Sequence, residues 1–369
     1  MKNYIRNIKS LLFVLIVIFT SNLIAQDHKT NLCILDINVW SGLDYVGTVK
    51  MGEYETPEIR EKRYQALIAQ IKELDPDIIG IHEANLLPKY AKRLAKDIEY
   101  VPFYHLGIGG IHIGPIGMPR NLREGDAILA KKELSPRWIG RKQLSGGYVG
   151  KHITFHFEDA TQVIGVRINV NNQSINIYAT HWHSSLLPRQ EVKQKAKEIY
   201  DSGKADKAEY DSLLTIINDG IEWRLGESDK TIQFITETAE DYPVILMGDF
   251  NALNESKEIK LLEQYGLIDT YKYLYPDSAG YTWDPKTNIN QQIHYIDNDT
   301  TTSQNIFDEI DYYKKHLSKR IDCIFVGDQA LISSEKLIIT DSKVVMKKII
   351  NGVQASDHYG ILSVIKINY

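Results

Sequence analysis

Residues 244–251 read Val-Ile-Leu-Met-Gly-Asp-Phe-Asn, an apolar run that turns polar at its end. Four apolar residues in succession before a glycine are typical of a buried strand. In an extended chain Asp249 and Asn251 point to the same side, so both can contact one phosphate or one metal ion. Gly248 permits a close approach of the backbone. The segment therefore predicts a core strand that carries functional side chains at its end.

Other apolar runs end in the same way. The polar residues at or just beyond these strand ends are Asn38, Glu83, His181, Asp322, and Asp357 with His358. Charged groups buried at strand ends cost free energy unless they are paired or bind a metal ion. If the six strand ends converge, four carboxylates, two amides and two imidazoles share one cleft. That combination predicts a hard-cation site with proton-transfer groups beside it.

Each of these residues also has a plain structural interpretation. Asn38 fits a turn cap, and His181 fits a hydrogen-bonded core histidine, because it shares a pleat face with apolar residues. Asp322 fits an ion pair with Arg320, and Asp357-His358 fits a helix cap or a turn. The prediction of a site rests on the combination and on no single member.

The remaining chain reads as strands and helices with clear boundaries. Thr56-Pro57 predicts the start of a helix that ends at Asp75-Pro76. A second helix is expected around 88–97, and two or three helices with breaks at Gly203 and Gly220 are expected in a surface excursion at about 184–240. Further strands are expected at 32–39, 78–81, 127–130, 321–326 and 361–367, with a hairpin formed by 166–170 and 175–179. Residues 107–117, rich in Gly and Ile, are expected to form a surface loop.

The composition is that of a folded protein. Of 369 residues, 43% are apolar and 25% are charged, which excludes disordered, collagen-like and coiled-coil classes. Repeats and low-complexity linkers are absent from the sequence, so residues 26–369 are expected to form one domain. No stable protein partner is predicted.

The first 25 residues resemble a secretory signal peptide. Lys2, Arg6 and Lys9 precede an apolar stretch at 11–19, which is too short to span a bilayer, and cleavage is expected after Ala25. An uncleaved anchor is the alternative. Cleavage predicts a secreted or periplasmic protein without a transmembrane segment. It removes 3 of the 43 basic residues and leaves 40 against 48 acidic ones, a formal charge of −8. Strong non-specific attraction to nucleic acid does not follow from that charge.

Two cysteines, Cys33 and Cys323, lie in apolar runs. In an oxidising compartment they fit a disulfide, and their apolar surroundings favour two buried thiols instead.

The order of the motifs resembles the signature blocks of the endonuclease/exonuclease/phosphatase superfamily. These blocks are Asn38, Ile81-His82-Glu83, Gly125-Asp126-Ala127-Ile128-Leu129, Thr180-His181, Gly248-Asp249-Phe250-Asn251, Arg320-Ile321-Asp322 and Ser356-Asp357-His358. The resemblance implies an α/β (α+β) fold, a four-layer sandwich of two packed mixed β-sheets flanked by helices. It also implies cleavage of phosphoester bonds with a divalent cation, usually Mg²⁺, with Mn²⁺ or Ca²⁺ as alternatives.

The same resemblance implies a role for each site residue. Glu83 becomes the main metal ligand, assisted by Asn38 and Asp357. His358, oriented by a carboxylate, becomes the general base that takes a proton from the attacking water. The remaining roles are water orientation by Asp249, hydrogen bonds to phosphoryl oxygens from Asn251 and His181, and orientation of His181 or contact with a phosphate by Asp322.

The substrate is less well specified than the chemistry. His82 replaces the Gln that the family usually places before its metal-binding Glu. Thr180-His181-Trp182-His183 resembles a block of the neutral sphingomyelinase branch, which implies a phospholipid headgroup as substrate; His183 also fits a cap of the helical excursion. The main alternative is an extracellular nuclease that uses a basic cluster at Arg120, Arg123, Lys131 and Lys132. A small phosphorylated metabolite and an inactive binding module are further alternatives.

Overall fold

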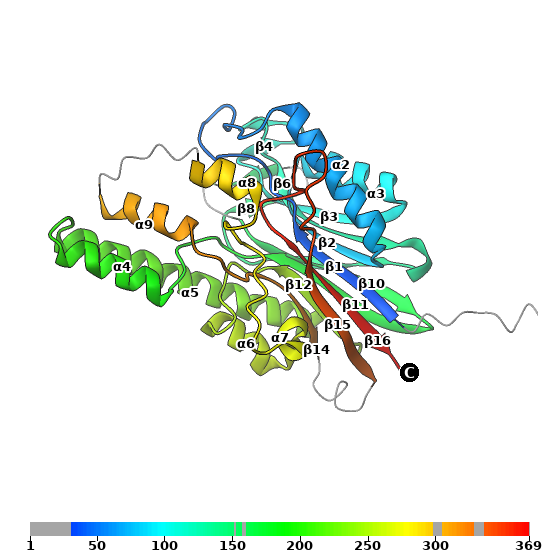
Figure 1. The fold of residues 1–369 in the computed structure, drawn as a ribbon. Helices are drawn as coiled ribbons and strands as arrows, with labels where there is room; N and C mark the ends of the chain where they lie inside the picture. Colours follow the sequence, from blue (N-terminus) through cyan, green and yellow to red (C-terminus); the bar gives the residue numbers. More distant parts are fainter. Residues whose placement is uncertain (1–30, 151–152, 157–159, 298–304, 328–335, 369) are drawn as a thin grey trace, which may run out of the picture. The chain divides into compact units, whose positions relative to one another are not determined.

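Two six-stranded sheets form the centre of the computed structural model (Figure 1). The structure describes residues 31–150, 153–156, 160–297, 305–327 and 336–368, so the expected signal peptide lies outside the described residues. The chain from Asn31 to Tyr369 clusters into one compact unit. Within the described ranges, no helix combines the length and the apolar character needed to cross a bilayer.

The first sheet surrounds the N-terminal strand. From edge to edge it contains β15 (Leu337–Val345), β16 (Gly360–Ile367), β1 (Asn31–Asn38), β2 (Ile78–Asn85), β6 (Glu124–Lys131) and β3 (Tyr100–Ile108). The β1–β2 pair is parallel and the other pairs are antiparallel. The sheet is therefore mixed.

The second sheet surrounds the segment 244–251. From edge to edge it contains β13 (Leu267–Asp269), β14 (Asp322–Gly327), β12 (Val244–Asp249), β11 (Gln173–His181), β10 (Gln162–Val170) and β7 (Arg137–Gln143). Only the β11–β12 pair is parallel within this sheet. The hairpin expected from 166–170 and 175–179 is confirmed as β10–β11. Gly248 lies close to β11, because a Cβ there would meet the Thr180 carbonyl oxygen at 2.1 Å.

Helices cover the outer face of each sheet. The α-helices are α2 (Pro57–Leu74), α3 (Leu87–Ile98), α4 (Gln190–Asp201), α5 (Lys207–Thr238), α6 (Lys257–Tyr265), α7 (Thr270–Leu274), α8 (Ile289–Gln291) and α9 (Ile306–Lys315). A 3₁₀ turn, η1 (Lys132–Leu134), lies between β6 and β7, and a π-helical turn, η2 (Gln292–Asp297), follows α8. The α2 and α3 helices pack on the first sheet, and α5 and α6 pack on the second. The expected four-layer sandwich of two mixed sheets is confirmed.

Two expectations about local structure are wrong. Residues 107–117 contain the end of β3 and two strands, β4 (Ile111–Ile113) and β5 (Ile116–Met118). These pair with β9 (Ile153–Phe155) and β8 (Tyr148–Val149) in a small antiparallel sheet. Gly220 does not break the helical excursion but lies inside α5, where a Cβ would meet Ser185 Oγ at 2.1 Å. It therefore permits close packing, whereas Gly203, between α4 and α5, has a left-handed φ of 77°.

The layer between the two sheets holds the inner core. Buried aliphatic side chains from both sheets meet there, among them Ile34, Ile78, Ile164, Ile177 and Ile245. Towards the end of β1, β11 and β12 the same alternating positions become polar. The strands therefore present apolar side chains to one part of this layer and polar side chains to another.

Candidate active site

Three neighbouring strands of the second sheet bring His181, Asp249 and Asp322 into one row. In the β11–β12 pair His181 lies opposite Asp249, and in the β12–β14 pair Asp249 lies opposite Asp322. Residues in register on neighbouring strands point to the same face of the sheet. His181 and Asp249 each follow a buried inner-core isoleucine, Ile177 and Ile245, by four residues. The row therefore continues the face that looks towards the first sheet.

The first sheet contributes Asn38 and Glu83. Asn38 is the last residue of β1 and pairs in register with His82 of β2. The β2–β6 pairing then shifts between Ile81 and Ala84, and Glu83 has a left-handed φ of 53°. A regular pleat points consecutive residues to opposite faces, and a bulge re-aims a side chain. The irregularity lets both His82 and Glu83 face the second sheet, at the cost of backbone strain.

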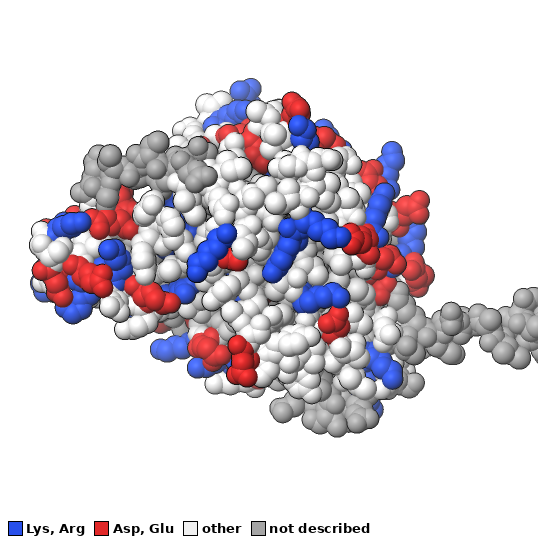
Figure 2. Space-filling view, viewed as in Figure 1, with Lys and Arg blue, Asp and Glu red and all other residues white. Residues whose placement is uncertain are grey.

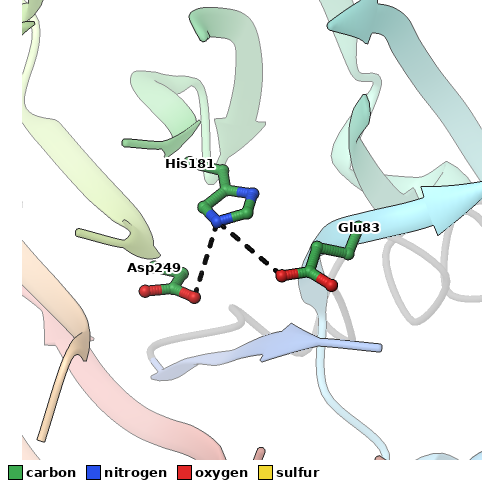
Figure 3. A group of neighbouring side chains, drawn as sticks. All are labelled: Glu83, His181 and Asp249. Carbon is green, nitrogen blue, oxygen red and sulfur yellow. Dashed lines mark ion pairs between the residues drawn. The ribbon is translucent and has the colours of Figure 1, made fainter. Parts of the chain in front are cut away.

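Glu83, His181 and Asp249 point towards one another (Figure 3). His181 Nε2 is 3.6 Å from Asp249 Oδ2 and 3.9 Å from Glu83 Oε1. Asn38 Nδ2 donates to Glu83 Oε1 at 2.7 Å and to Asp249 Oδ2 at 3.0 Å. Asn251 Nδ2 lies 3.1 Å from His181 Nε2, and Asn251 also has a left-handed φ, of 45°. These five predicted residues form one network of contacts.

His358 approaches the network from the loop before β16. Its Nδ1 lies 3.0 Å from Asp322 Oδ2 and 3.8 Å from Asp249 Oδ2. Asp322 thus contacts His358 rather than His181, and it supplies the orienting carboxylate that was expected beside His358. The backbone N–H of His358 donates to Ser356 Oγ at 3.1 Å. Both donor and acceptor of the His358–Asp322 pair are buried.

Asp357, the remaining predicted metal ligand, lies at the same end of the sheets. Its Oδ2 accepts a hydrogen bond from the Tyr295 hydroxyl at 2.9 Å. The preceding Ser356 donates through Oγ to the Asn38 carbonyl at 2.7 Å, which ties this loop to the end of β1. All eight predicted site residues therefore come together at one end of the inter-sheet layer.

Comparison with known proteins identifies this arrangement of sheets. No family model and no curated protein matches the sequence. Several solved structures match nearly the whole chain, among them the following three. D. rerio TDP2, complexed with a single-strand DNA product, is 17% identical, covers 92% of this chain and 100% of its own, and has a TM-score of 0.54. The endonuclease/exonuclease/phosphatase from Bacteroides vulgatus is 14% identical with the same coverage and a TM-score of 0.54. The human Nocturnin catalytic domain with a bound sulfate anion is 14% identical, covers 93% of this chain and 95% of its own, and has a TM-score of 0.53.

The chain has the endonuclease/exonuclease/phosphatase fold. The resemblance found in the ordered sequence motifs is confirmed at the level of the fold. The activity belongs to the site, because one fold supports many reactions.

The electrostatics of this endonuclease/exonuclease/phosphatase fold differ from one site carboxylate to the next. Burial raises the pKa of a carboxyl group, but at Asp249 the charges of His358 and His181 outweigh burial, and its pKa lies below the usual value. Burial dominates at Asp322 and raises its pKa, and at Asp357 it raises the pKa to about 6. Burial lowers the pKa of His358, but the nearby carboxylates, chiefly Asp322, raise it to about 10.

The donor set fits a divalent cation. One group of possible ligand atoms comes from Glu83, His181 and Asp249, and a second from Asp249, Asp322 and His358; within each group all atoms lie within 4.8 Å of one another. Closely spaced buried carboxylates are favourable when a cation neutralises them, and carboxylate oxygens are the ligands of hard cations. Asn38 turns Nδ2 to these carboxylates while its Oδ1 accepts the Trp40 N–H at 2.9 Å. In this structure it holds Glu83 and Asp249 together.

A cavity of about 480 Å³ opens beside the network. Glu83, Asp249, Asn251, Asp357 and His358 contribute to one part of its lining. Cationic side chains contribute to another, namely Arg189, Lys314, Lys315 and Lys319. A cavity that holds both acidic and basic groups suits an anionic substrate together with a cation.

Sequence patterns did not single out Lys319 and Trp283. The backbones of these two residues pair with each other, and Lys319 Nζ lies 4.6 Å from the Trp283 ring centroid. Trp283 contacts the His358 ring edge-on at 5.1 Å. Burial lowers the pKa of Lys319 to about 8. The polar stretch before Lys319 has no apolar periodicity that would place either residue. The one sequence signal for Lys319 was its position directly before the motif Arg320-Ile321-Asp322.

His82, the departure from the family pattern, lies behind the network. Its Nε2 is 2.8 Å from Asp36 Oδ1 and its Nδ1 is 2.9 Å from Asp126 Oδ1. All three side chains are buried. A Cβ at Gly80 would meet Asp36 Oδ1 at 2.3 Å, so this position has no room for a larger residue. His82 therefore stabilises the buried carboxylates of Asp36 and Asp126, which lie behind the site residues.

His183, the second histidine of the Thr-His-Trp-His block, packs against α5. Its ring stacks on Trp223 with centroids 4.1 Å apart, and its backbone N–H donates to Glu227 Oε2 at 2.9 Å. Glu227 is fully buried. His183 is therefore not a helix cap as expected, because Arg189 and Asp206 occupy the N-cap positions of α4 and α5. Its contacts are structural, with the middle of α5.

The basic cluster considered for a nuclease is separate from the cavity lining. Lys131 forms ion pairs with Asp75 at 2.8 Å and with Asp77 at 3.2 Å. Neither it nor Lys132, Arg120 or Arg123 belongs to the described lining of the cavity. On the face seen in Figure 2, Lys and Arg are interspersed with Asp and Glu. Free cysteines, not a disulfide, are found at Cys33 and Cys323, and only Cys323 is fully buried.

Proposed function

We propose that this chain is a divalent-metal-dependent phosphoester hydrolase that acts as a phosphodiesterase, with Mg²⁺ as its cation and Mn²⁺ or Ca²⁺ as substitutes. One observation carries the proposal. The buried His358–Asp322 pair lies beside Asp249, which is joined through Asn38 to Glu83. A proton-transfer pair next to a cation-binding carboxylate cluster is what hydrolysis of a phosphoester requires.

Glu83 would hold the cation together with Asp357, and Asn38 would support them. When bound, the cation would place positive charge on the phosphoryl oxygens and offset the carboxylates that keep His358 protonated. Asp322 accepts from Nδ1 of His358, because a carboxylate can only accept, and this leaves Nε2 to take a proton from water.

The other side chains would position the reacting groups. Asp249 would orient the attacking water, beside His358. Asn251 and His181, in contact with each other at 3.1 Å, would donate hydrogen bonds to the phosphoryl oxygens as negative charge develops there. Lys319, on the cavity wall, adds a cation that matches an anionic substrate.

A first experiment tests the chemistry with a generic diester. We expect the parent protein to hydrolyse bis-p-nitrophenyl phosphate with Mg²⁺, Mn²⁺ or Ca²⁺, and to lose this activity with chelator. The activity of the Glu83→Ala variant should be about 10³-fold lower than that of the parent, since the substitution removes the main metal ligand. Glu61→Ala, an exposed glutamate of α2 paired with Arg93, is the matched control and should keep full activity. Absence of hydrolysis with all three cations would contradict the proposal and favour an inactive binding module.

For the substrate we propose a phospholipid headgroup. Support comes from the similarity of Thr180-His181-Trp182-His183 to the neutral sphingomyelinase branch. A nucleic acid is the alternative, favoured by the single-strand DNA product bound to D. rerio TDP2, which shares this fold. Sphingomyelin, plasmid DNA and an inositol phosphate offered side by side with Mg²⁺ separate these substrates. Release of phosphocholine alone supports the lipid, and nicking of the plasmid alone supports a nuclease.

We also propose that the protein is exported, to the medium or the periplasm. Support comes from the basic, apolar and small-residue order of residues 1–25. Recovery of the exported protein with Gln26 as its first residue is the expected result of N-terminal sequencing. Retention of Met1 on a membrane-associated product would favour the uncleaved anchor.

A further inference from the structure

The small sheet of β5, β4, β9 and β8 carries an exposed apolar face. Its register aligns Met118, Ile111, Phe155 and Tyr148 in one row across the four strands. A second row contains Ile116, Ile113 and Ile153. The residues between them along the strands, His112, Val149 and Thr154, are buried. Cross-strand partners share a face, so both rows lie on the same outward side.

The exposure of this face is unusual for aliphatic side chains. Ile116 is 79% exposed, Ile113 69%, Tyr148 65% and Ile153 53%. Isolated exposed apolar residues are normal, but a contiguous set marks an interaction surface. Folding alone gives no reason to place large apolar residues at the outward positions of all four strands, so a partner that covers them is expected.

The chain segments that form this face carry basic residues and no acidic ones, although Glu53 of the neighbouring loop accepts a hydrogen bond from Asn121. Residues 105–123 contain Arg120 and Arg123 and no acidic residue, and residues 135–157 contain four basic residues and no acidic one. The two carboxylates that follow, Glu158 and Asp159, lie outside the described residues. Arg123 holds the β4–β5 turn by donating to the Gly114 carbonyl at 2.8 Å, and Arg141 donates to the Val149 carbonyl of β8. No described carboxylate forms an ion pair with either guanidinium.

The face is also continuous with the candidate active site. The Arg120 N–H donates to the Val49 carbonyl at 3.0 Å, and Val46 and Val49 are 71% and 51% exposed. The loop that carries them also lines the catalytic cavity through Leu43 and Tyr45. Gly107 and Ile108, just before β4, line a second pocket together with Glu83 and His181.

We propose that this face, defined by Ile111, Ile113, Ile116, Met118, Tyr148 and Ile153, docks on a lipid surface with anionic headgroups. Aliphatic side chains enter the boundary between headgroups and acyl chains, Tyr is favoured there, and basic groups are attracted to anionic lipid. A symmetric dimer through the same face would bring the arginines of two copies together, which is unfavourable. Docking would hold the catalytic cavity close to lipid headgroups.

The docking proposal rests on the proposed function, because it states where the proposed hydrolase acts. Binding to vesicles tests docking separately from hydrolysis. The probes are vesicles of phosphatidylcholine with phosphatidylserine and vesicles of phosphatidylcholine alone, in a flotation assay with chelator present. The double variant I113S/I116S is compared with I216S, which changes an exposed isoleucine of α5. All variants are made in the full chain, so that residues 11–19 contribute equally to each.

We expect the parent to bind the phosphatidylserine vesicles, I113S/I116S to bind at least about tenfold more weakly, and I216S to bind as the parent does. Arg120→Glu should weaken binding to anionic vesicles and reduce its sensitivity to salt. All variants should hydrolyse the soluble diester equally; loss of that activity in the parent would contradict the proposed function but not the docking. Equal binding by I113S/I116S and the parent, or a parent dimer that these substitutions dissociate, would overturn the docking proposal.

Discussion

The layer between the two sheets has an apolar part and a polar part built on the same strands. On β11, Ile177 is buried among aliphatic side chains, and His181 four residues later contacts Glu83 and Asp249. On β12, Ile245 and Asp249 repeat the contrast. Burial of an isoleucine contributes about 1.5–3 kcal/mol, whereas burial of a charge costs free energy unless it is paired. The comparison teaches that one part of the layer stabilises the fold and the other uses that stability to hold a strained, charged site.

Among substitutions that compare the two parts on one strand, the largest loss of activity is expected from His181→Ala. This substitution removes a donor to the phosphoryl oxygens and should lower kcat/KM on the generic diester by about 10²–10³-fold. The free energy of unfolding should change by less than about 1 kcal/mol, since His181 is partly exposed and belongs to no apolar cluster. Activity assays and urea titrations measure the two quantities. A large loss of stability with unchanged activity would give His181 a structural role instead.

The opposite result is expected four residues earlier on the same strand. Ile177→Ala leaves a cavity in the inner core and should destabilise the protein by about 2–5 kcal/mol. Well below its melting temperature the variant should keep the activity of the parent, because Ile177 lies in the apolar cluster, four residues before His181. Comparison of kcat at a low temperature with the urea midpoint checks this. If Ile177→Ala and His181→Ala lose activity equally, the division between the two parts is wrong.

Cation binding should stabilise the polar part selectively. Mg²⁺ at about 100 times its dissociation constant should stabilise the parent by about 2.7 kcal/mol, because a ligand that binds only the folded state shifts unfolding by mass action. Mg²⁺ should stabilise the Ile177→Ala variant by the same free energy as the parent, and should stabilise the Glu83→Ala variant much less. Thermal unfolding with and without chelator measures the shift. An equal shift in all three proteins would place the cation elsewhere.

The smallest effect is a pH-dependent one at His82. Burial lowers its pKa, but Asp36 and Asp126 raise it well above 6.5. The folded protein therefore binds a proton more tightly than the unfolded chain. This stabilisation is complete below the unfolded pKa of about 6.5 and is lost as the pH rises through the folded pKa, by up to about 1.4 kcal/mol per unit between the two.

His82→Gln removes this titration. With chelator present, the difference in urea midpoint between parent and variant should be larger at about pH 6 than at about pH 9. Gln65→Ala, on an exposed position of α2, is the control: it removes no titratable group and should change the urea midpoint equally at both pH values. A difference that is constant with pH would mean that His82 stays neutral between its two carboxylates.

Much of this fold was predictable because its strands and helices have local signatures. Thr56 caps α2 by accepting from the Ile59 N–H, and α2 ends at Leu74, as the sequence indicates. The polar ends of β1, β11, β12 and β14 were predictable for the same reason, since each interrupts an apolar run. The family motifs then supplied their order.

The failures involve contacts between distant segments. The short strands β4 and β5 have apolar residues only on an exposed face, so their pattern does not indicate burial. Gly220 looked like a helix break because its partner, Ser185, lies elsewhere in the sequence. The sequence also could not show which histidine Asp322 contacts. The strand register places Asp249 between Asp322 and His181, and strand register is not visible in the sequence.

The irregularity of β2 at Glu83 makes the number of residues in this strand as important as their identity. Deletion of Ala84, which follows Glu83, would restore a regular pleat, and that pleat would turn the Glu83 carboxylate away from Asp249. In proteins that share this architecture, substitutions in this part of the strand should therefore be tolerated better than insertions or deletions. In alignments of distant relatives, a gap at this point would indicate loss of hydrolysis as strongly as replacement of the glutamate.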